Sequence, residues 1–69
     1  MTDTKELEII IKKSGLKKSY IAKEIGLSRQ RLTAKIKNES PFTATHINIL
    51  CDLLKITSLK EKERIFFGK

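Results

Sequence analysis

The sequence is poor in cysteine and has no long apolar run, and each scarcity excludes a class of protein. With Cys51 as its only cysteine, the chain can form no internal disulfide, which fits a reducing compartment. No apolar stretch approaches the length of a membrane span, and no signal-peptide pattern opens the chain. We therefore expect a cytoplasmic protein that does not associate with a membrane.

The side chains that support catalysis or hold cofactors are also scarce. His46 and Cys51 lie five residues apart, on different faces of one helix, so they form no nucleophile–base pair. One histidine and one cysteine cannot fill a zinc site, and the sequence has no glycine-rich phosphate loop. We expect no enzyme, no cofactor or metal and no small-molecule ligand. Cys51 is expected in the core, and His46 at the surface or near a helix cap.

What the sequence does contain is a succession of short helical patterns, with no alternating strand pattern. It predicts one all-α domain over residues 1–69, made of five helices joined by short loops. The first helix runs from an Asp3 cap to Gly15, the second over about 18–25 and the third over about 28–37. The fourth runs from a Thr43 cap to about Leu54, and the fifth starts at Thr57 or Ser58. Asp3 with Glu6, and Ser58 with Glu61, are spaced as capping boxes.

The second and third helices have the spacing of a helix-turn-helix, over about residues 18–37. Ala22 is small enough for a crossing helix to approach closely. Gly26 follows four residues later, where the chain must turn sharply and glycine tolerates a left-handed conformation. Leu27 fills the corner, Ser28 can cap the third helix, and Leu32 is the next apolar anchor.

Positive charge is concentrated on this motif. The chain carries a net charge of +7. Residues 17–40 hold seven basic and two acidic side chains, a net +5, whereas residues 1–16 sum to zero and residues 41–69 to +2. A lysine-rich surface can simply keep a small protein soluble. Concentration on one motif favours a polyanionic partner, namely nucleic acid.

The fourth helix is apolar on two sides, which leaves two interpretations open. Ile47, Leu50, Cys51 and Leu54 form one stripe, and Ile49 and Leu53 lie on roughly the opposite side. The helix can be central, with neighbours on several faces. Alternatively, its surplus face can form a dimer interface with some of the apolar residues that follow. These are Ile56, Leu59, Ile65, Phe66 and Phe67.

The pattern of the helix-turn-helix and the helices after it resembles the small DNA-binding domains of phage repressors and Cro proteins, within the XRE-type regulators. The residues that carry this resemblance are Ile21, Ala22, Ile25, Gly26, Leu27 and Leu32. The Ser28–Leu32 stretch, the Phe42–Thr43 pair and the Ile65–Phe67 ending are similar to small regulators from phages of low-GC Gram-positive bacteria. The resemblance implies a lambda-repressor-like fold and a homodimer that binds operator DNA in the bacterial host, with the third helix in the major groove.

Two positions depart from the family pattern. Lys18 stands where the family usually has a glutamine that touches phosphate, and Lys35 replaces an apolar residue. The buried stripe of the third helix is therefore expected to be Leu32 and Ile36, slightly rotated. The opposite face then carries Gln30, Thr33, Ala34 and Lys37, with Arg31 at the margin.

The side chains of the third helix suit base readout, with phosphate contacts around them. Arg29 can bind guanine, Gln30 can bind adenine, and Thr33 and Ala34 offer methyl groups to thymine. The residues expected to contact bases are Ser28, Arg29, Gln30, Thr33 and Ala34. Those expected to contact phosphates are Lys17, Lys18, Ser19, Arg31, Lys37 and Asn38. The alternative for Arg29 and Gln30 is a solvated surface. Lys35 is expected to be solvated, and Tyr20 either contacts phosphate or packs on the second helix.

A protein-interaction module on the same fold, such as an antirepressor or a phage accessory protein, is the rival interpretation. Such a module would more often carry apolar or mixed charges on its third helix, where this chain has a bare positive face. No oligomerisation or self-cleavage domain is appended to these 69 residues, so a short Cro-like role is expected over that of a full repressor.

Overall fold

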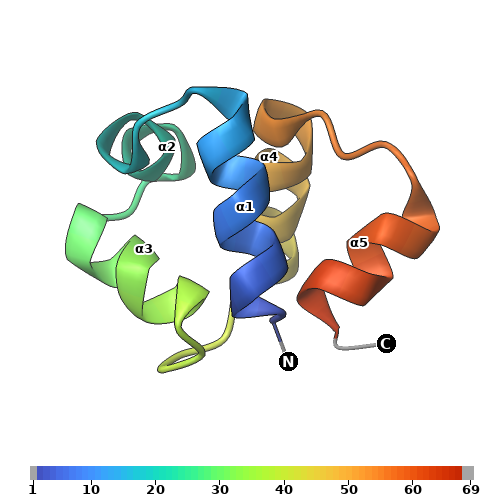
Figure 1. The fold of residues 1–69 in the computed structure, drawn as a ribbon. Helices are drawn as coiled ribbons and strands as arrows, with labels where there is room; N and C mark the ends of the chain where they lie inside the picture. Colours follow the sequence, from blue (N-terminus) through green and yellow to red (C-terminus); the bar gives the residue numbers. More distant parts are fainter. Residues whose placement is uncertain (1, 68–69) are drawn as a thin grey trace.

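The computed structural model describes residues 2–67, which form five α-helices and no strand (Figure 1). The helices are α1 (Thr4–Ser14), α2 (Lys18–Ile25), α3 (Arg29–Ile36), α4 (Ala44–Leu54) and α5 (Leu59–Phe66). The predicted all-α, five-helix fold class is confirmed. Residues 1, 68 and 69 of the expected domain lie outside the described residues. Within residues 2–67, no helix combines the length and the hydropathy that a membrane crossing requires.

Local side-chain caps explain where four of these helices begin. In each case the side chain before the first turn accepts a hydrogen bond from the backbone N–H three residues later. The pairs are Asp3 with Glu6, Ser28 with Arg31, Thr43 with His46, and Ser58 with Glu61. The N-cap of α2 is Lys17, which makes no such bond. The N-terminus of α2 therefore keeps backbone N–H groups without a side-chain partner.

The two expected capping boxes form only by half. Asp3 and Ser58 accept their bonds, but Glu6 and Glu61 do not bond back to the cap residues. Both glutamates instead pair with Arg64 of α5, at 3.3 Å and 3.9 Å. A complete box occurs at α4, where Nδ1 of His46 accepts from the Thr43 N–H at 3.3 Å. His46 is thus a cap residue, one of the two places predicted for it.

The core lies between α1 and α4, with α2 and α3 on one side and α5 on the other (Figure 1). Leu7, Ile21, Leu32, Leu50 and Ile65 are completely buried, and Cys51 is buried among the same apolar side chains. Ile49 and Leu53 are partly buried and pack against this core. The interpretation of α4 as a central helix therefore accounts for most of its apolar surface.

The end of the chain also belongs largely to the core. Ile65 and Phe66 are 0% and 4% exposed, and the Phe66 ring meets Phe42 edge to face at 5.7 Å. The backbone of Asp3 donates to the Ile65 carbonyl at 2.6 Å, so α5 is fastened to the start of α1. Three of the candidates for a dimer interface are buried by the monomer itself, so for them that expectation is wrong: Ile56, Ile65 and Phe66.

Candidate nucleic-acid interface

A tight turn at Gly26 sets the angle between α2 and α3. Gly26 has a φ of +88°, and its N–H and that of Leu27 both donate to the Ala22 carbonyl at 2.9 Å. A Cβ at Gly26 would meet no atom within 4 Å, so the backbone conformation, and not crowding, is what requires glycine. Ala22 is buried in the core, as expected for a small residue on the inner side of α2. The turn then passes directly into the Ser28 cap of α3.

The buried side of α3 fixes which side faces out. Leu32 and Ile36 are 0% and 1% exposed, as the rotated stripe predicts. The Thr4 hydroxyl of α1 donates to the Ile36 carbonyl at 2.7 Å and holds the C-terminal end of α3. With this side anchored, the opposite side chains point away from the core. They line one shallow surface hollow, together with a loop residue: Arg29, Gln30, Thr33, Ala34, Lys37 and Glu39.

Four of the five residues expected to contact bases therefore share one surface, and Lys37 joins them. Ser28 and Arg31 lie outside the hollow, although both are exposed at the start of α3. The Ser28 oxygen already accepts the Arg31 N–H at 3.2 Å, so capping occupies part of its hydrogen-bonding capacity. The contacts of all these residues with DNA stay a prediction.

Glu39 is the residue of this surface that sequence reasoning missed. It follows α3 in a loop, and its N–H donates to the Ala34 carbonyl at 2.8 Å, which folds the loop back along the helix. The outcome is that an acidic residue lines the same hollow as Lys37 and Thr33, on a face that was expected to be purely positive. The acidic residue was visible in the sequence, but the turn that brings it to this surface was not.

Lys35 was expected to be solvated, but its side chain does not extend freely into solvent. Its ammonium donates to the Pro41 carbonyl at 2.9 Å and to the Ser40 hydroxyl at 3.4 Å. The lysine thus ties the α3–α4 loop to α3, and its charge points toward protein acceptors. The positive face of α3 is accordingly carried by Arg29, Arg31 and Lys37.

The residues at the start of α2 differ in whether their side chains already have a partner within the protein. Lys17 and Ser19 are exposed, and Tyr20 is 46% exposed. The Lys18 ammonium lies 2.9 Å and 3.2 Å from the two carboxylate oxygens of Glu8 on α1. Lys18 is therefore already paired with an anion of the protein.

Asn38 has its side chain engaged within the molecule. Its amide donates to the Thr2 carbonyl at 2.7 Å and to the Thr4 hydroxyl at 3.3 Å, and its oxygen accepts the Thr2 N–H at 2.9 Å. Its φ of +64° is one that asparagine tolerates better than most residues. The expected phosphate contact of Asn38 would compete with these bonds.

Cys51 lies apart from this surface. It is 7% exposed, and burial raises the pKa of its thiol above the usual value. A thiol that stays protonated among apolar neighbours is a poor nucleophile. Cys51 is therefore a packing residue, as its position on an apolar stripe predicts.

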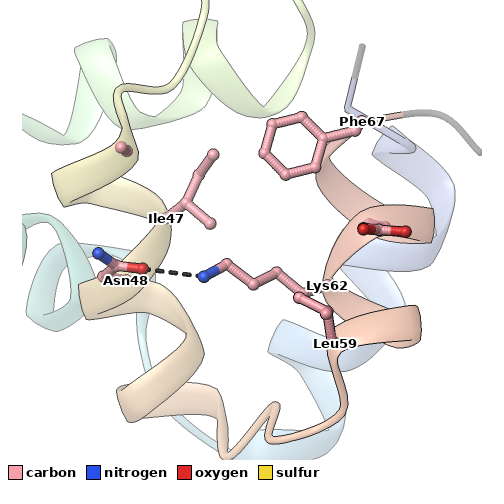
Figure 2. Close-up of a pocket in the computed structure, with 7 residues that line it drawn as sticks. Ile47, Asn48, Leu59, Lys62 and Phe67 are labelled. Atoms are coloured by element: carbon pink, nitrogen blue, oxygen red, sulfur yellow. Dashed lines mark hydrogen bonds between the residues drawn. The ribbon is translucent and has the colours of Figure 1, made fainter.

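A second surface feature is an apolar groove between α4 and α5 (Figure 2). Ile47 of α4 faces Leu59 and Phe67 across it, and the Lys62 ammonium bridges the groove to the Asn48 side-chain oxygen at 2.9 Å. Leu59 is 69% exposed and Phe67 49% exposed, which is unusual for side chains of this size. This α4–α5 groove has a volume of about 280 Å³. Among the apolar residues considered for a dimer interface, Leu59 and Phe67 are the two that stay exposed.

Comparison with models of protein families gives a match over residues 6–61, to the Cro/C1-type HTH DNA-binding domain. The matched range begins within α1 and ends within α5, so it contains the helix-turn-helix and the hollow on α3. No curated protein and no solved structure matches the chain.

Proposed function

Because the chain belongs to the Cro/C1-type helix-turn-helix DNA-binding domain family, we propose that it regulates transcription by reading operator half-sites with α3 in the major groove. The observation that carries this proposal is the gathering of Arg29, Gln30, Thr33 and Ala34 on one outward surface of α3. Their common direction is a consequence of the complete burial of Leu32 and Ile36. The action belongs in the cytoplasm of a bacterial host, and the resemblance points to a phage or prophage as the source.

The chemistry of these four side chains fits base edges. A guanidinium can donate twice to guanine O6 and N7, and a carboxamide can pair with adenine N6 and N7. Thr33 and Ala34 are partly buried at the floor of the hollow, where their methyl groups can meet a thymine methyl. Arg29 and Gln30 are longer and exposed, so they can reach across the groove.

Phosphate contacts position this surface without reading sequence. Lys17 and Ser19 stand at the one helix start that has no side-chain cap among the helices of residues 2–67. Backbone N–H groups at a helix N-terminus attract anions, and Lys17 adds a full positive charge. Arg31 and Lys37 supply exposed cations at the two ends of α3.

The proposal includes a homodimer formed through the α4–α5 groove. One copy measures 27 Å in its longest dimension, whereas successive major-groove faces on one side of DNA lie about 34 Å apart, so one copy reaches one half-site. Leu59 and Phe67 are exposed beside Lys62 and Glu63, so a two-fold partner would bring apolar and opposite charges together. A second copy is the occupant that this combination favours.

Salt titration of binding to a random-sequence DNA duplex tests the proposal. Lys17, Lys18, Arg31 and Lys37 offer up to four cationic contacts per copy. Each contact contributes about −0.9 to the slope of log K against log salt, so we expect a slope of about −3 to −4 for each bound copy. A slope near zero, or equally tight binding to an acidic protein, would contradict DNA binding and favour a protein-interaction module.

A further inference from the structure

Lys18, one of the cations proposed to bind phosphate, already forms an ion pair within the protein. Lys18 is the first residue of α2, and its ammonium contacts both carboxylate oxygens of Glu8, at 2.9 Å and 3.2 Å. Glu8 lies ten residues earlier, on α1. The side chains are 29% and 40% exposed, so the pair is accessible from solvent. A partner from solution can therefore compete for either member.

The pair stands where a DNA phosphate would arrive. The N-terminus of α2 lacks a side-chain cap, whereas the other four helices of residues 2–67 each have one. A phosphate drawn to these free N–H groups would approach the Lys18 ammonium as well. It would find a carboxylate already bound there, which offers the same kind of anionic oxygens.

We propose that Glu8 competes with DNA phosphates for Lys18 and so lowers the affinity of the protein for DNA of any sequence. This inference rests on the proposed function. When DNA binds, Lys18 can leave Glu8, which loses the ion pair, or it can stay, which leaves a carboxylate beside the phosphate. Both outcomes reduce the net gain from the contact. Because only a phosphate is involved, the effect is equal for operator and random DNA.

Removing the Glu8 charge tests this inference. Glu8→Gln preserves the shape of the side chain and removes the negative charge that attracts the Lys18 ammonium. We expect affinity for random duplex to rise about two- to five-fold, the range to which the stabilisation by an exposed ion pair corresponds. The salt slope should become steeper by up to about 0.9, because one more cation is available to displace counterions. Affinity for a selected operator should rise by the same factor.

Glu24→Gln is the matched control. Glu24 is an exposed residue of α2, and no ion pair of Glu24 is seen among residues 2–67. The variant changes the net charge equally and should leave affinity within about 1.5-fold, because a single exposed charge away from the contact is largely screened. Circular dichroism should show that both variants are as helical as the parent.

The outcomes separate the inference from its alternatives. Tighter, steeper binding by Glu8→Gln alone supports competition. An equal gain with Glu24→Gln would mean that only net charge matters, and weaker binding would mean that Glu8 orients Lys18 toward the phosphate; either result overturns the inference. If the parent protein itself binds duplex without salt dependence, the proposed function has failed. If the parent shows the steep slope and Glu8→Gln does not exceed it, only this inference has failed.

Discussion

Gln30 lies on the side of α3 that points away from the core, and its direction follows from its neighbours. Leu32 two residues later and Ile36 six residues later are buried, which at about 100° per residue places Gln30 on the opposite side. It is exposed and lines the hollow with Arg29 and Thr33. A carboxamide held in this way can distinguish adenine from the other bases.

Replacement of Gln30 by alanine tests that role. We expect Gln30→Ala to weaken binding to a selected operator by about 1–3 kcal/mol, the usual cost of a lost bidentate base contact. Binding to random duplex should hardly change, since the side chain is proposed to contact a base edge and not a phosphate. Fluorescence anisotropy with the two duplexes measures both quantities. The melting temperature should be unchanged, because Gln30 is outside the core.

Lys17→Ala is the variant with which Gln30→Ala is compared. It removes an exposed cation at the start of α2 and should weaken operator and random DNA by similar factors, with a slope shallower by about 0.9. If Gln30→Ala also lowers all binding equally, Gln30 contacts the backbone, and Arg29 or Arg31 becomes the stronger candidate for base readout.

At the residue scale, the sequence predicted which side chains of α3 point outward. It did not predict which side chains are already bound by other parts of the protein. The outward face of α3 could be predicted because it depends on the periodicity of Leu32 and Ile36 within one helix. The engagement of Lys18 by Glu8 and of Asn38 by Thr2 could not, because their partners come from other elements. Glu39 was missed for the same reason, since a turn after α3 carries it onto the surface.

At the scale of elements, α3 is held at both ends by contacts from outside the helix-turn-helix. The Thr4 hydroxyl donates to the Ile36 carbonyl, and Asn38 makes two hydrogen bonds with the Thr2 backbone and one with the Thr4 hydroxyl. Together these contacts fasten the start of α1 to the end of α3. We infer that Asn38 positions the reading helix, in place of the phosphate contact expected from sequence.

Two substitutions at Asn38 separate these roles. Asn38→Ala should lower the free energy of unfolding by about 1–2 kcal/mol, because it loses the hydrogen bonds of the amide. Alanine also tolerates the left-handed φ of +64° less well than asparagine does. Asn38→Gly loses the same bonds but accommodates the backbone, so its loss should be smaller. Urea denaturation measures both.

The free energy of unfolding and the duplex affinity together decide between the two roles of Asn38. A residue that fastens α3 should lower the free energy of unfolding when it is replaced by alanine, and because its amide is neutral, neither variant should change the salt slope. If the stability of Asn38→Ala is unchanged and duplex affinity falls, the phosphate contact is the correct interpretation and the fastening role is wrong.

The bounds of the elements followed closely from sequence because the caps are local. Asp3, Ser28, Thr43 and Ser58 each bind an N–H three residues away, a distance at which sequence spacing is decisive. The glutamate halves of the two capping boxes were wrong because Arg64 intervened, which is far along the chain from Glu6 and one helical turn from Glu61. Arg64 of α5 offers Glu6 and Glu61 a cationic partner that a backbone N–H cannot match.

At the scale of the whole molecule, most of the net positive charge and the two most exposed large apolar side chains lie on different elements. Residues 17–40, which include α2 and α3, carry a net charge of +5, whereas the exposed side chains of Leu59 and Phe67 line the groove between α4 and α5. This separation suits a protein that binds DNA with one surface and a second copy with another. A two-fold dimer would then present two copies of α3 to successive turns of one face of the duplex.

Selection of bound duplexes from a pool of random sequence tests the central claim, which is sequence reading by paired copies of α3. We expect an enriched motif made of two related half-sites in two-fold symmetry, with centres about 10–10.5 base pairs apart. An enriched motif with a single asymmetric half-site would contradict the dimer. A pool that stays random while the protein binds it would contradict sequence reading by α3.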